Sequence, residues 1–315
     1  MAVAHLKDIV KRYGTTLALD NVDLEIGEGE ILGLMGPNGS GKTTLIYALV
    51  GLIAIDAGEV QVFGKDQQAN LVEIKRRIGL VTQDITVFED LTARENLEFF
   101  GGIYGLKGAE LKSRVAQTLE LVGLEDQADK VPAKFSGGMK RRLNIACALT
   151  HGPEFLIMDE PTVGIDPQSR NHILETVREL NRQGTTILYT THYIEEVQAV
   201  ASRVVIVDEG RVIAQGTIDE LVGKIQHEEK IMLEVAQPSE ELLEKLRRID
   251  GVKQVEQQGK VIKIISQAKA GNLDRALSVA REAGGLLSVN AEKPSLEDVF
   301  LTLTGKRLRD GGEKK

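Results

Sequence analysis

The run GPNGSGKTT, residues 36 to 44, constrains the fold more than any other part of the chain. It follows the apolar stretch EILGLM and leads into TTLIYALVGL, so we expect a strand, a glycine-rich loop and a helix in that order. The glycines let the backbone wrap closely around a triphosphate, with its N–H groups pointing inward. The sequence therefore predicts an α/β nucleotide-binding fold whose phosphate loop consists of Gly36, Pro37, Asn38, Gly39, Ser40, Gly41, Lys42, Thr43 and Thr44.

A second motif, FLIMDEP at 155 to 161, supplies carboxylates for the same site. A buried strand that ends at Asp159 places this charge at the carboxyl edge of the sheet, where α/β proteins bind ligands. In such a site Lys42 bridges the β- and γ-phosphates, while Thr43 and Asp159 bind Mg²⁺. Glu160 is placed to orient and deprotonate a water molecule. These residues predict ATP and Mg²⁺ as cofactors.

Two more polar residues follow apolar runs, Gln83 after RIGLVT and His192 after TTILYTT. A single glutamine or histidine at such a position is usually structural. If both end strands of the same sheet, however, they point toward one site. Gln83 is then expected to reach Mg²⁺ or the attacking water, and His192 the γ-phosphate.

A second glycine motif, FSGGMKRRL, begins at residue 135. Ser136 stands in the N-cap position of a basic helix, with Gly137 and Gly138 behind it, and a helix N-terminus of this kind suits an anion. The chain therefore contains two candidate phosphate sites about a hundred residues apart, which raises the question of whether both hold the same nucleotide.

The order of motifs resembles the nucleotide-binding subunit of an ATP-binding cassette (ABC) transporter over residues 1 to about 222: phosphate loop, glutamine, SGG, DEP and histidine. The resemblance implies an ABC-type cassette with a mixed sheet core, an antiparallel β subdomain and a helical subdomain at about 85–150. It makes Glu160 the catalytic base and FSGGM the signature motif. It also implies that Tyr13 stacks on adenine and that Asp166 lies in the loop linking the two halves.

The same resemblance answers the question about the two phosphate sites. Two subunits pack head to tail, and each ATP lies between the phosphate loop of one and Ser136, Gly137 and Gly138 of the other. The expected partners are a second cassette, as a homodimer, and a transmembrane permease subunit that holds the chain at the inner face of the cell membrane. Phe135 and Met139 depart from the common Leu-Ser-Gly-Gly-Gln signature, but the Ser-Gly-Gly core remains, so we expect ATPase activity.

Beyond the cassette, the polar stretch 223–229 is expected to be a linker. Residues 230–305 are predicted to form strand, helix, strand, strand, helix and strand, the order of a small α+β ferredoxin-like domain, with a closing helix. Its final stretch, KPSLEDVFLTLTG, resembles the tail domain of subunits that serve exporters of drugs, lipids, sodium or polysaccharides. Residues 306–315 are expected to be disordered.

Composition limits the alternatives. The net charge of −8 gives no electrostatic footprint for nucleic acid, so no nucleic-acid partner is expected. Cys147 has no second cysteine to pair with, and a cytoplasmic protein is predicted. A P-loop kinase or GTPase would leave the signature and Glu160 unused, and a non-hydrolysing scaffold would not need Glu160 and His192. The main alternative is a soluble ABC-type ATPase that acts on nucleic acid or ribosomes.

Four aromatic residues gather between Gln83 and the signature, namely Phe88, Phe99, Phe100 and Tyr104. A groove lined by such side chains could hold a helix of the membrane subunit, because aromatic anchors dominate contacts of this kind. They could equally form the core of the helical subdomain. The sequence leaves both interpretations open.

Overall fold

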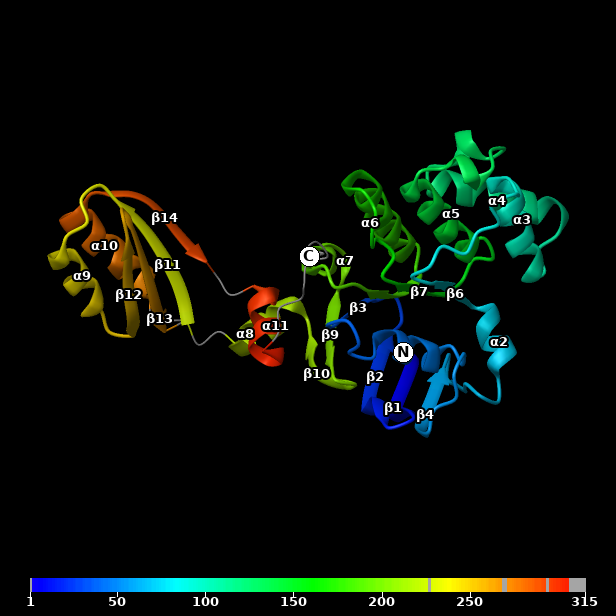
Figure 1. The fold of residues 1–315 in the computed structure, drawn as a ribbon, viewed down its shortest axis with the longest axis horizontal. Coiled ribbons are helices and arrows are strands. Elements are labelled where there is room, and N and C mark those ends of the chain that lie inside the picture. The colour runs from blue at the N-terminus through cyan, green and yellow to red at the C-terminus, as the bar shows by residue number, and fades with distance from the viewer. Residues whose placement is uncertain (1, 226–227, 268–270, 293–294, 306–315) are drawn as a thin grey trace. The chain divides into compact units, whose positions relative to one another are not determined.

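The computed structural model describes residues 2–225, 228–267, 271–292 and 295–305 (Figure 1). The chain separates into two compact units, with the division between Thr217 and Ile218. This division comes before the boundary expected after residue 222, and each unit has its own sheets and hydrophobic core.

The centre of the first unit is a six-stranded sheet in the order β10-β9-β3-β8-β7-β6. The strands from β9 to β6 run parallel, and β10 is antiparallel to β9. Every residue of β3, β7 and β8 is buried, which is typical of a sheet covered on both faces. The mixed sheet core is thus confirmed, and its strands are β3 (Ile31–Met35), β6 (Ile78–Val81), β7 (Phe155–Asp159), β8 (Thr186–Thr190), β9 (Arg203–Asp208) and β10 (Arg211–Gly216).

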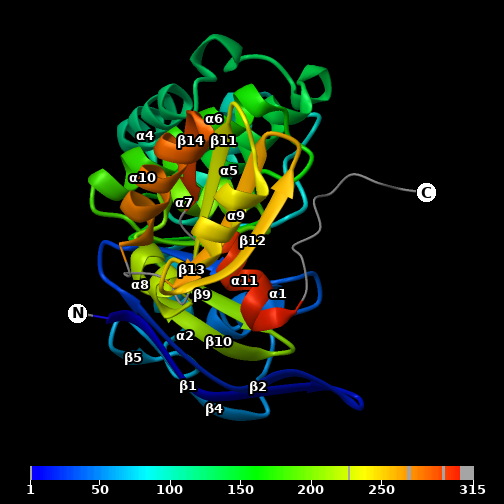
Figure 2. The same ribbon diagram turned by 90° about the vertical axis from the view of Figure 1, so that its left-hand side faces the viewer.

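An antiparallel sheet in the order β2-β1-β4-β5 forms the second layer of this unit. Figures 1 and 2 show β1, β2 and β4 side by side, in blue. Side chains of β1 and β2 share one hydrophobic core with the central sheet, for example Leu6, Ile9 and Leu24 with Leu34. The strands are β1 (Ala2–Tyr13), β2 (Thr16–Gly27), β4 (Ala57–Val62) and β5 (Lys65–Asp66).

Three helices of the first unit, α3 to α5, enclose a hydrophobic core of their own. Thr92 and Glu95 form a capping box at the start of α3. Cys147 belongs to this core, and burial raises the pKa of its thiol to about 12. The helices of the unit are α1 (Lys42–Leu49), α2 (Leu71–Arg76), α3 (Ala93–Ile103), α4 (Gly108–Leu121), α5 (Gly137–Leu149), α6 (Pro167–Arg182) and α7 (Ile194–Val200), with 3₁₀ turns at Glu125–Gln127 and Pro132–Lys134.

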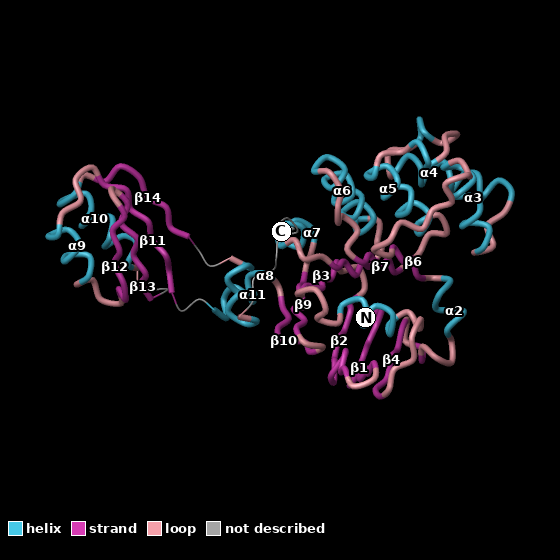
Figure 3. Tube along the Cα trace, in the orientation of Figure 1, coloured by secondary structure: helices cyan, strands magenta, loops and turns pink. Residues whose placement is uncertain are grey.

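The second unit is an antiparallel sheet in the order β12-β13-β11-β14 with two helices, α9 and α10, on one face (Figure 3). Alternate residues of β11 and β13, such as Leu233 and Ile264, pack against Leu246 and Ala280 of these helices. Its elements are α8 (Ile218–Ile225), β11 (Glu228–Val235), α9 (Glu240–Arg247), β12 (Val252–Gln258), β13 (Val261–Gln267), α10 (Asn272–Gly284), β14 (Leu286–Glu292) and α11 (Leu296–Thr304).

The segment expected as a linker at 223–229 differs in the structure. Helix α8 continues to Ile225 and β11 begins at Glu228, so most of this segment belongs to regular elements. The reason is the apolar spacing of IDELVGKI, in which apolar residues recur every three or four positions and the charged residues fall between them. The tail predicted at 306–315 lies outside the described residues.

Candidate functional site

The phosphate loop predicted at 36–44 joins β3 to α1. Gly39 and Gly41 have φ angles of 82° and 105°, in the left-handed region that glycine adopts without strain. Gly36 has a different constraint: a Cβ atom there would lie 2.2 Å from the carbonyl oxygen of Val207 in β9. The loop is therefore packed against the central sheet, and its glycines are needed for two separate reasons, left-handed backbone and close packing.

The side chain of Lys42 is buried and folds back over this loop. Its Nζ donates to the carbonyl oxygens of Gly36 at 2.9 Å and Pro37 at 3.2 Å. Burial lowers the pKa of Lys42, while the carboxylates of Glu160 and Asp159 oppose that shift. The cation is thus held at the centre of the loop by backbone oxygens and by the carboxylates of Asp159 and Glu160 at the end of β7.

Asp159 is the last residue of β7, and both of its carboxylate oxygens accept hydrogen bonds. Thr43 Oγ1 donates to Oδ2 at 2.8 Å, and Thr190 Oγ1, at the end of β8, donates to Oδ1 at 2.7 Å. The structure therefore brings the two predicted metal ligands, Thr43 and Asp159, into direct contact. Thr190 is a site residue that the sequence motifs do not predict, although its position at the end of an apolar run just before His192 is a signal for it.

Glu160 has an unusual backbone, with a φ angle of 46°. A non-glycine residue in this region carries strain that persists only where neighbours fix it, and such residues concentrate at functional sites. Here the Glu160 N–H donates to Thr190, to the carbonyl oxygen at 3.1 Å and to Oγ1 at 2.9 Å. The adjacent strand thus fixes the backbone turn that directs the Glu160 side chain.

The Glu160 carboxylate lies between two basic side chains. Oε2 is 3.3 Å from Nδ1 of His192, and Oε1 is 3.6 Å from Nζ of Lys42. The His192 ring lowers the pKa of Glu160 most, and Lys42 adds to this effect against the opposing effect of burial. Glu160, His192 and Lys42, predicted as parts of one site, are therefore in contact.

Gln83 lies in the exposed loop that follows β6, and β6 is the neighbour of β7 in the sheet. Arg141 of α5 is buried and donates to the carbonyl oxygens of Thr82, at 2.8 Å, and of Gln83. Asn144, one turn further along α5, accepts from the N–H and the hydroxyl of Thr86 at 3.0 Å each. This connection between the Gln83 loop and the signature helix is not predicted from the sequence, although a charged residue on the apolar side of α5 is a signal for it.

Tyr13 is the last residue of β1, and its side chain is 50% exposed. Lys11 Nζ lies 5.4 Å from the ring centroid, a cation–π contact. Among the described residues, no hydrogen bond or ring contact joins Tyr13 to the phosphate loop. The ring is open for stacking, but the structure does not bring it into contact with the other predicted site residues.

The second glycine motif begins helix α5 as predicted, with Ser136 as its N-cap and the Ser136 Oγ accepting from the N–H of Met139 at 3.2 Å. Asp166 caps α6, where its Oδ1 accepts from the N–H of Ser169 at 2.9 Å, and this hydrogen bond lowers the pKa of Asp166. A Cβ atom on Gly138 would lie 3.0 Å from Asp166 Oδ2. Two helix N-termini therefore adjoin, and their dipoles add a positive potential there.

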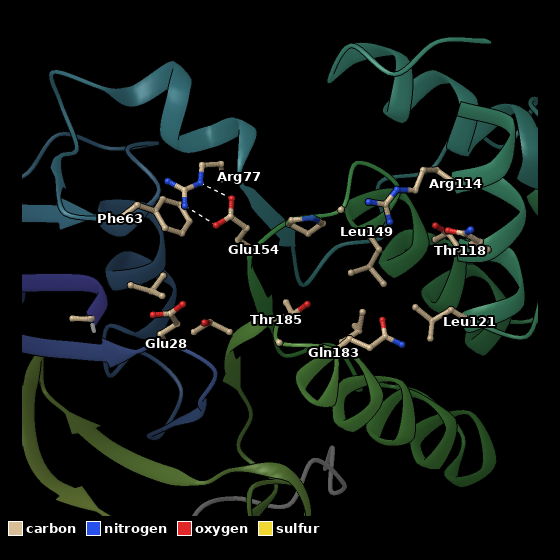
Figure 4. Close-up of a pocket in the computed structure, with 18 of the residues that line it drawn as sticks. Glu28, Phe63, Arg77, Arg114, Thr118, Leu121, Leu149, Glu154, Gln183 and Thr185 are labelled. Carbon is tan, nitrogen blue, oxygen red and sulfur yellow. Dashed lines mark hydrogen bonds and ion pairs between the residues drawn. The ribbon is translucent and has the colours of Figure 1, made fainter. Parts of the chain in front are cut away.

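A separate cavity of about 940 Å³ lies at the opposite edge of the central sheet, where β6, β7 and β8 begin (Figure 4). Arg77 and Glu154 form a bidentate pair at this cavity, with distances of 2.7 and 2.6 Å, and Arg114 of α4 faces it. None of the predicted site residues lines it. Ligands of parallel sheets bind at the carboxyl ends of strands, so the site around Glu160 is the candidate functional site.

Comparison with known proteins agrees with this geometry. A family model described as ABC transporter matches residues 19–163. The linearmycin resistance ATP-binding protein LnrL of Bacillus subtilis (strain 168) is 44% identical over 307 residues, which cover 96% of this chain and 99% of that protein. The Nod factor export ATP-binding protein I of Cupriavidus metallidurans is 36% identical, over 98% of this chain and 99% of that protein.

A solved structure is also similar to the first unit. It is the dimeric ATP-binding cassette MJ0796 in a post-hydrolysis state with bound ADP and Pi, and it has 31% identity and a TM-score of 0.62. The match covers 68% of this chain and 98% of that one. No described helix has both the length and the apolar character needed to cross a bilayer. The alternative of an ABC ATPase acting on nucleic acid or ribosomes finds no support among these relatives. The chain belongs to the ABC transporter family, as one of its ATP-binding ATPase subunits.

Proposed function

We propose that Glu160 is the base of ATP hydrolysis in this subunit, with Lys42 and His192 beside it. The single observation that carries the proposal is the position of the Glu160 carboxylate, 3.6 Å from Lys42 Nζ and 3.3 Å from His192 Nδ1. A general base must be ionised and close to the water that it activates, and Glu160 is ionised at neutral pH because His192 and Lys42 offset the effect of burial on its pKa. Lys42 is suited to stabilise the phosphates and His192 to contact the γ-phosphate.

Mg²⁺ would be held by Thr43 and Asp159. Their oxygens are 2.8 Å apart at the carboxyl edge of the sheet. The described residues contain no group of three or more His, Cys, Asp or Glu side chains that could hold a metal ion by themselves. The set of Thr43 and Asp159 fits Mg²⁺, which takes one or two protein oxygens together with substrate phosphates and water. When bound, the ion would neutralise charge on the phosphates. Gln83 is proposed as an additional ligand or as a residue that positions the water.

The second phosphate cradle, formed by Ser136, Gly137 and Gly138, is proposed to bind the nucleotide of a partner subunit. Ser136 and Gly137 are exposed, and no hydrogen bond among the described residues joins them to the chain's own phosphate loop. The similar cassette was solved as a dimer, which supports the pairing of two cassettes. In a head-to-tail homodimer Ser136, Gly137, Gly138 and Asp166 face the ATP held by the other copy, whose adenine stacks on Tyr13 of that copy.

The membrane partner is proposed to be a permease through which the dimer drives export, at the inner face of the cell membrane. The names of the two relatives, linearmycin resistance and Nod factor export, support an exporter. Phe88 and Phe99 are 45% and 46% exposed, whereas Phe100 packs against the helical core. The exposed pair suits docking of a permease helix, while Phe100 serves the core.

Two variants test this proposal together. Glu160→Gln keeps the shape and hydrogen bonding of the side chain but cannot accept a proton from water, so hydrolysis should stall after ATP is enclosed. Because ATP favours the closed dimer only through its higher affinity for that state, Glu160→Gln with Mg-ATP should accumulate dimer. Adding Ser136→Arg crowds the facing cradle and should dissolve the dimer while each phosphate loop stays intact.

Light scattering with and without ATP distinguishes the outcomes. A double variant that dimerises as well as the single variant would mean that the two cradles do not enclose one nucleotide. Turnover of ATP by Glu160→Gln at the parental rate would instead remove Glu160 from the role of base.

A further inference from the structure

Glu196, on helix α7, is an acidic residue that the proposed hydrolysis does not use, although it is almost completely buried at 1% exposure. Thr162 Oγ1 donates to it, at 2.7 Å from Oε1 and 2.8 Å from Oε2. The Tyr189 hydroxyl donates to Oε2 at 3.0 Å, and Arg170 Nε lies 3.4 Å from Oε1. Two hydroxyl donors and one guanidinium ion-pair partner therefore surround this carboxylate.

These three partners of Glu196 come from the segments that carry the candidate site. Thr162 is two residues after Glu160, in the loop between β7 and α6. Tyr189 belongs to β8, three residues before His192, and Arg170 is in the first turn of α6, four residues after Asp166. Glu196 itself lies on α7, four residues after His192. The Glu196 carboxylate thus connects the segment that carries Glu160, the segment that carries His192 and the start of α6.

A buried carboxylate is costly unless every acceptor is satisfied, and an apolar side chain of similar size would pack here without that cost. The hydrogen bonds that Glu196 accepts instead fix the positions of the segments that donate them. Glu160 has a strained backbone, and Thr190 fixes it at the Glu160 N–H. Thr162, bound to Glu196, fixes the chain on the other side of Glu160. The strained residue is therefore held between two anchors, as such residues require.

We propose that Glu196 is a positioning residue for hydrolysis: through Thr162 it holds the loop 161–166, so that Glu160 faces His192 and Lys42. The inference rests on the proposed roles of Glu160 and His192. Glu196, Thr162 and Tyr189 do not contact the phosphate loop among the described hydrogen bonds. Their loss should consequently slow the chemical step and leave ATP binding unchanged.

The test uses the purified chain of 315 residues and measures kcat, KM for ATP, ATP binding and thermal unfolding. Thr162→Val keeps the shape of the side chain but removes the hydroxyl donor. It should lower kcat by about tenfold, since small displacements of catalytic groups have effects of this size or larger. KM and the Kd for ATP should stay within about twofold, because the phosphate loop is untouched. Thr162→Ser restores the donor and should restore kcat.

Glu196→Gln should also lower kcat, and the neighbouring Glu195→Gln is its matched control, because Glu195 is exposed on the same helix. Two residues that act through one contact have non-additive effects, so Thr162→Val with Glu196→Gln should lose little more than the worse single variant. Tyr189→Phe removes the second hydroxyl and should act in the same direction.

The inference is overturned if Thr162→Val turns over ATP at the parental rate. It is also overturned if Thr162→Ser fails to restore kcat, or if the loss appears as a raised KM or as unfolding at the assay temperature. Glu160→Gln, assayed in parallel, separates this inference from the proposed site. Parental turnover there would reject the role of Glu160, whereas a stalled Glu160→Gln with a fully active Thr162→Val would reject only the role of Glu196.

Discussion

Gly138 at the start of α5 packs directly against Ser169 in the first turn of α6, so closely that a Cβ atom on Gly138 would lie 2.0 Å from Ser169 Oγ and 2.6 Å from Ser169 Cβ. No real Cβ atom makes contacts this short. Glycine at 138 is therefore required by helix packing inside one subunit, in addition to the proposed contact with a phosphate of the partner's nucleotide.

Gly138→Ala should force the starts of α5 and α6 apart. Overpacking of this kind costs about 1–3 kcal/mol, and the thermal unfolding temperature should fall accordingly. ATP-dependent dimerisation of a Glu160→Gln protein should weaken too, because Asp166 and Ser136 lie on the displaced helix ends. Gly137→Ala is the control for stability, since nothing lies within 4 Å of a Cβ atom there. Equal unfolding temperatures for the two variants would contradict the packing argument.

Lys42→Ala should abolish measurable ATP binding and turnover, because the cation in contact with the phosphate loop is lost. Titration with a fluorescent ATP analogue measures this directly. Lys65→Ala is a suitable control, as Lys65 pairs with Glu73 on the surface at 2.5 Å, away from the loop. ATP hydrolysis by Lys42→Ala at the parental rate would show that the phosphate-loop assignment is wrong.

Phe88→Ala tests the proposed docking surface. The Phe88 ring packs edge-on against Phe99 at a centroid distance of 4.9 Å, and about half of its surface is open. We expect ATP binding and the thermal melt to stay close to those of the parent, while co-sedimentation with membranes that contain the permease is reduced. Phe100→Ala should instead lower stability, because Phe100 packs against the helical core. A collapsed melt for Phe88→Ala would favour a core role for Phe88 as well.

We expect His151 to make the stability of the fold depend on pH. Its ring stacks on Tyr104 at 3.7 Å, its Nε2 lies 3.1 Å from the carbonyl oxygen of Ile78, and burial lowers its pKa to about 4. Between pH 6.5 and about 4 the unfolded chain binds this proton and the folded chain does not, so stability falls as the pH drops through that window. Urea unfolding should show a loss of up to about 2 kcal/mol by pH 5 from this residue.

His151→Gln should remove this part of the pH dependence, and His5→Gln should not, because His5 is exposed. An unchanged pH dependence of the urea midpoint in His151→Gln would mean that His151 is not held neutral by the fold.

The sequence by itself determined the local units of the site. Gly39 and Gly41 have left-handed backbone, and β7 ends at Asp159. Each of these features belongs to a short motif of neighbouring residues, so the motif alone leaves few alternative local structures. The same holds for the cap at Ser136 and for the capping box at the start of α3, since each involves residues only three positions apart.

Only the tertiary structure decided which of these units meet. Strand β8 lies between β3 and β7, although it follows β7 in the sequence, and this order places Thr190 against Asp159 and His192 against Glu160. The Glu196 network could not be predicted for the same reason, because its partners come from a loop, a strand and a helix that are separate segments of the sequence. Hydrophobic periodicity shows which face of a strand is buried, but it carries no information about which strand will be the neighbour. That choice depends on packing over the whole sheet.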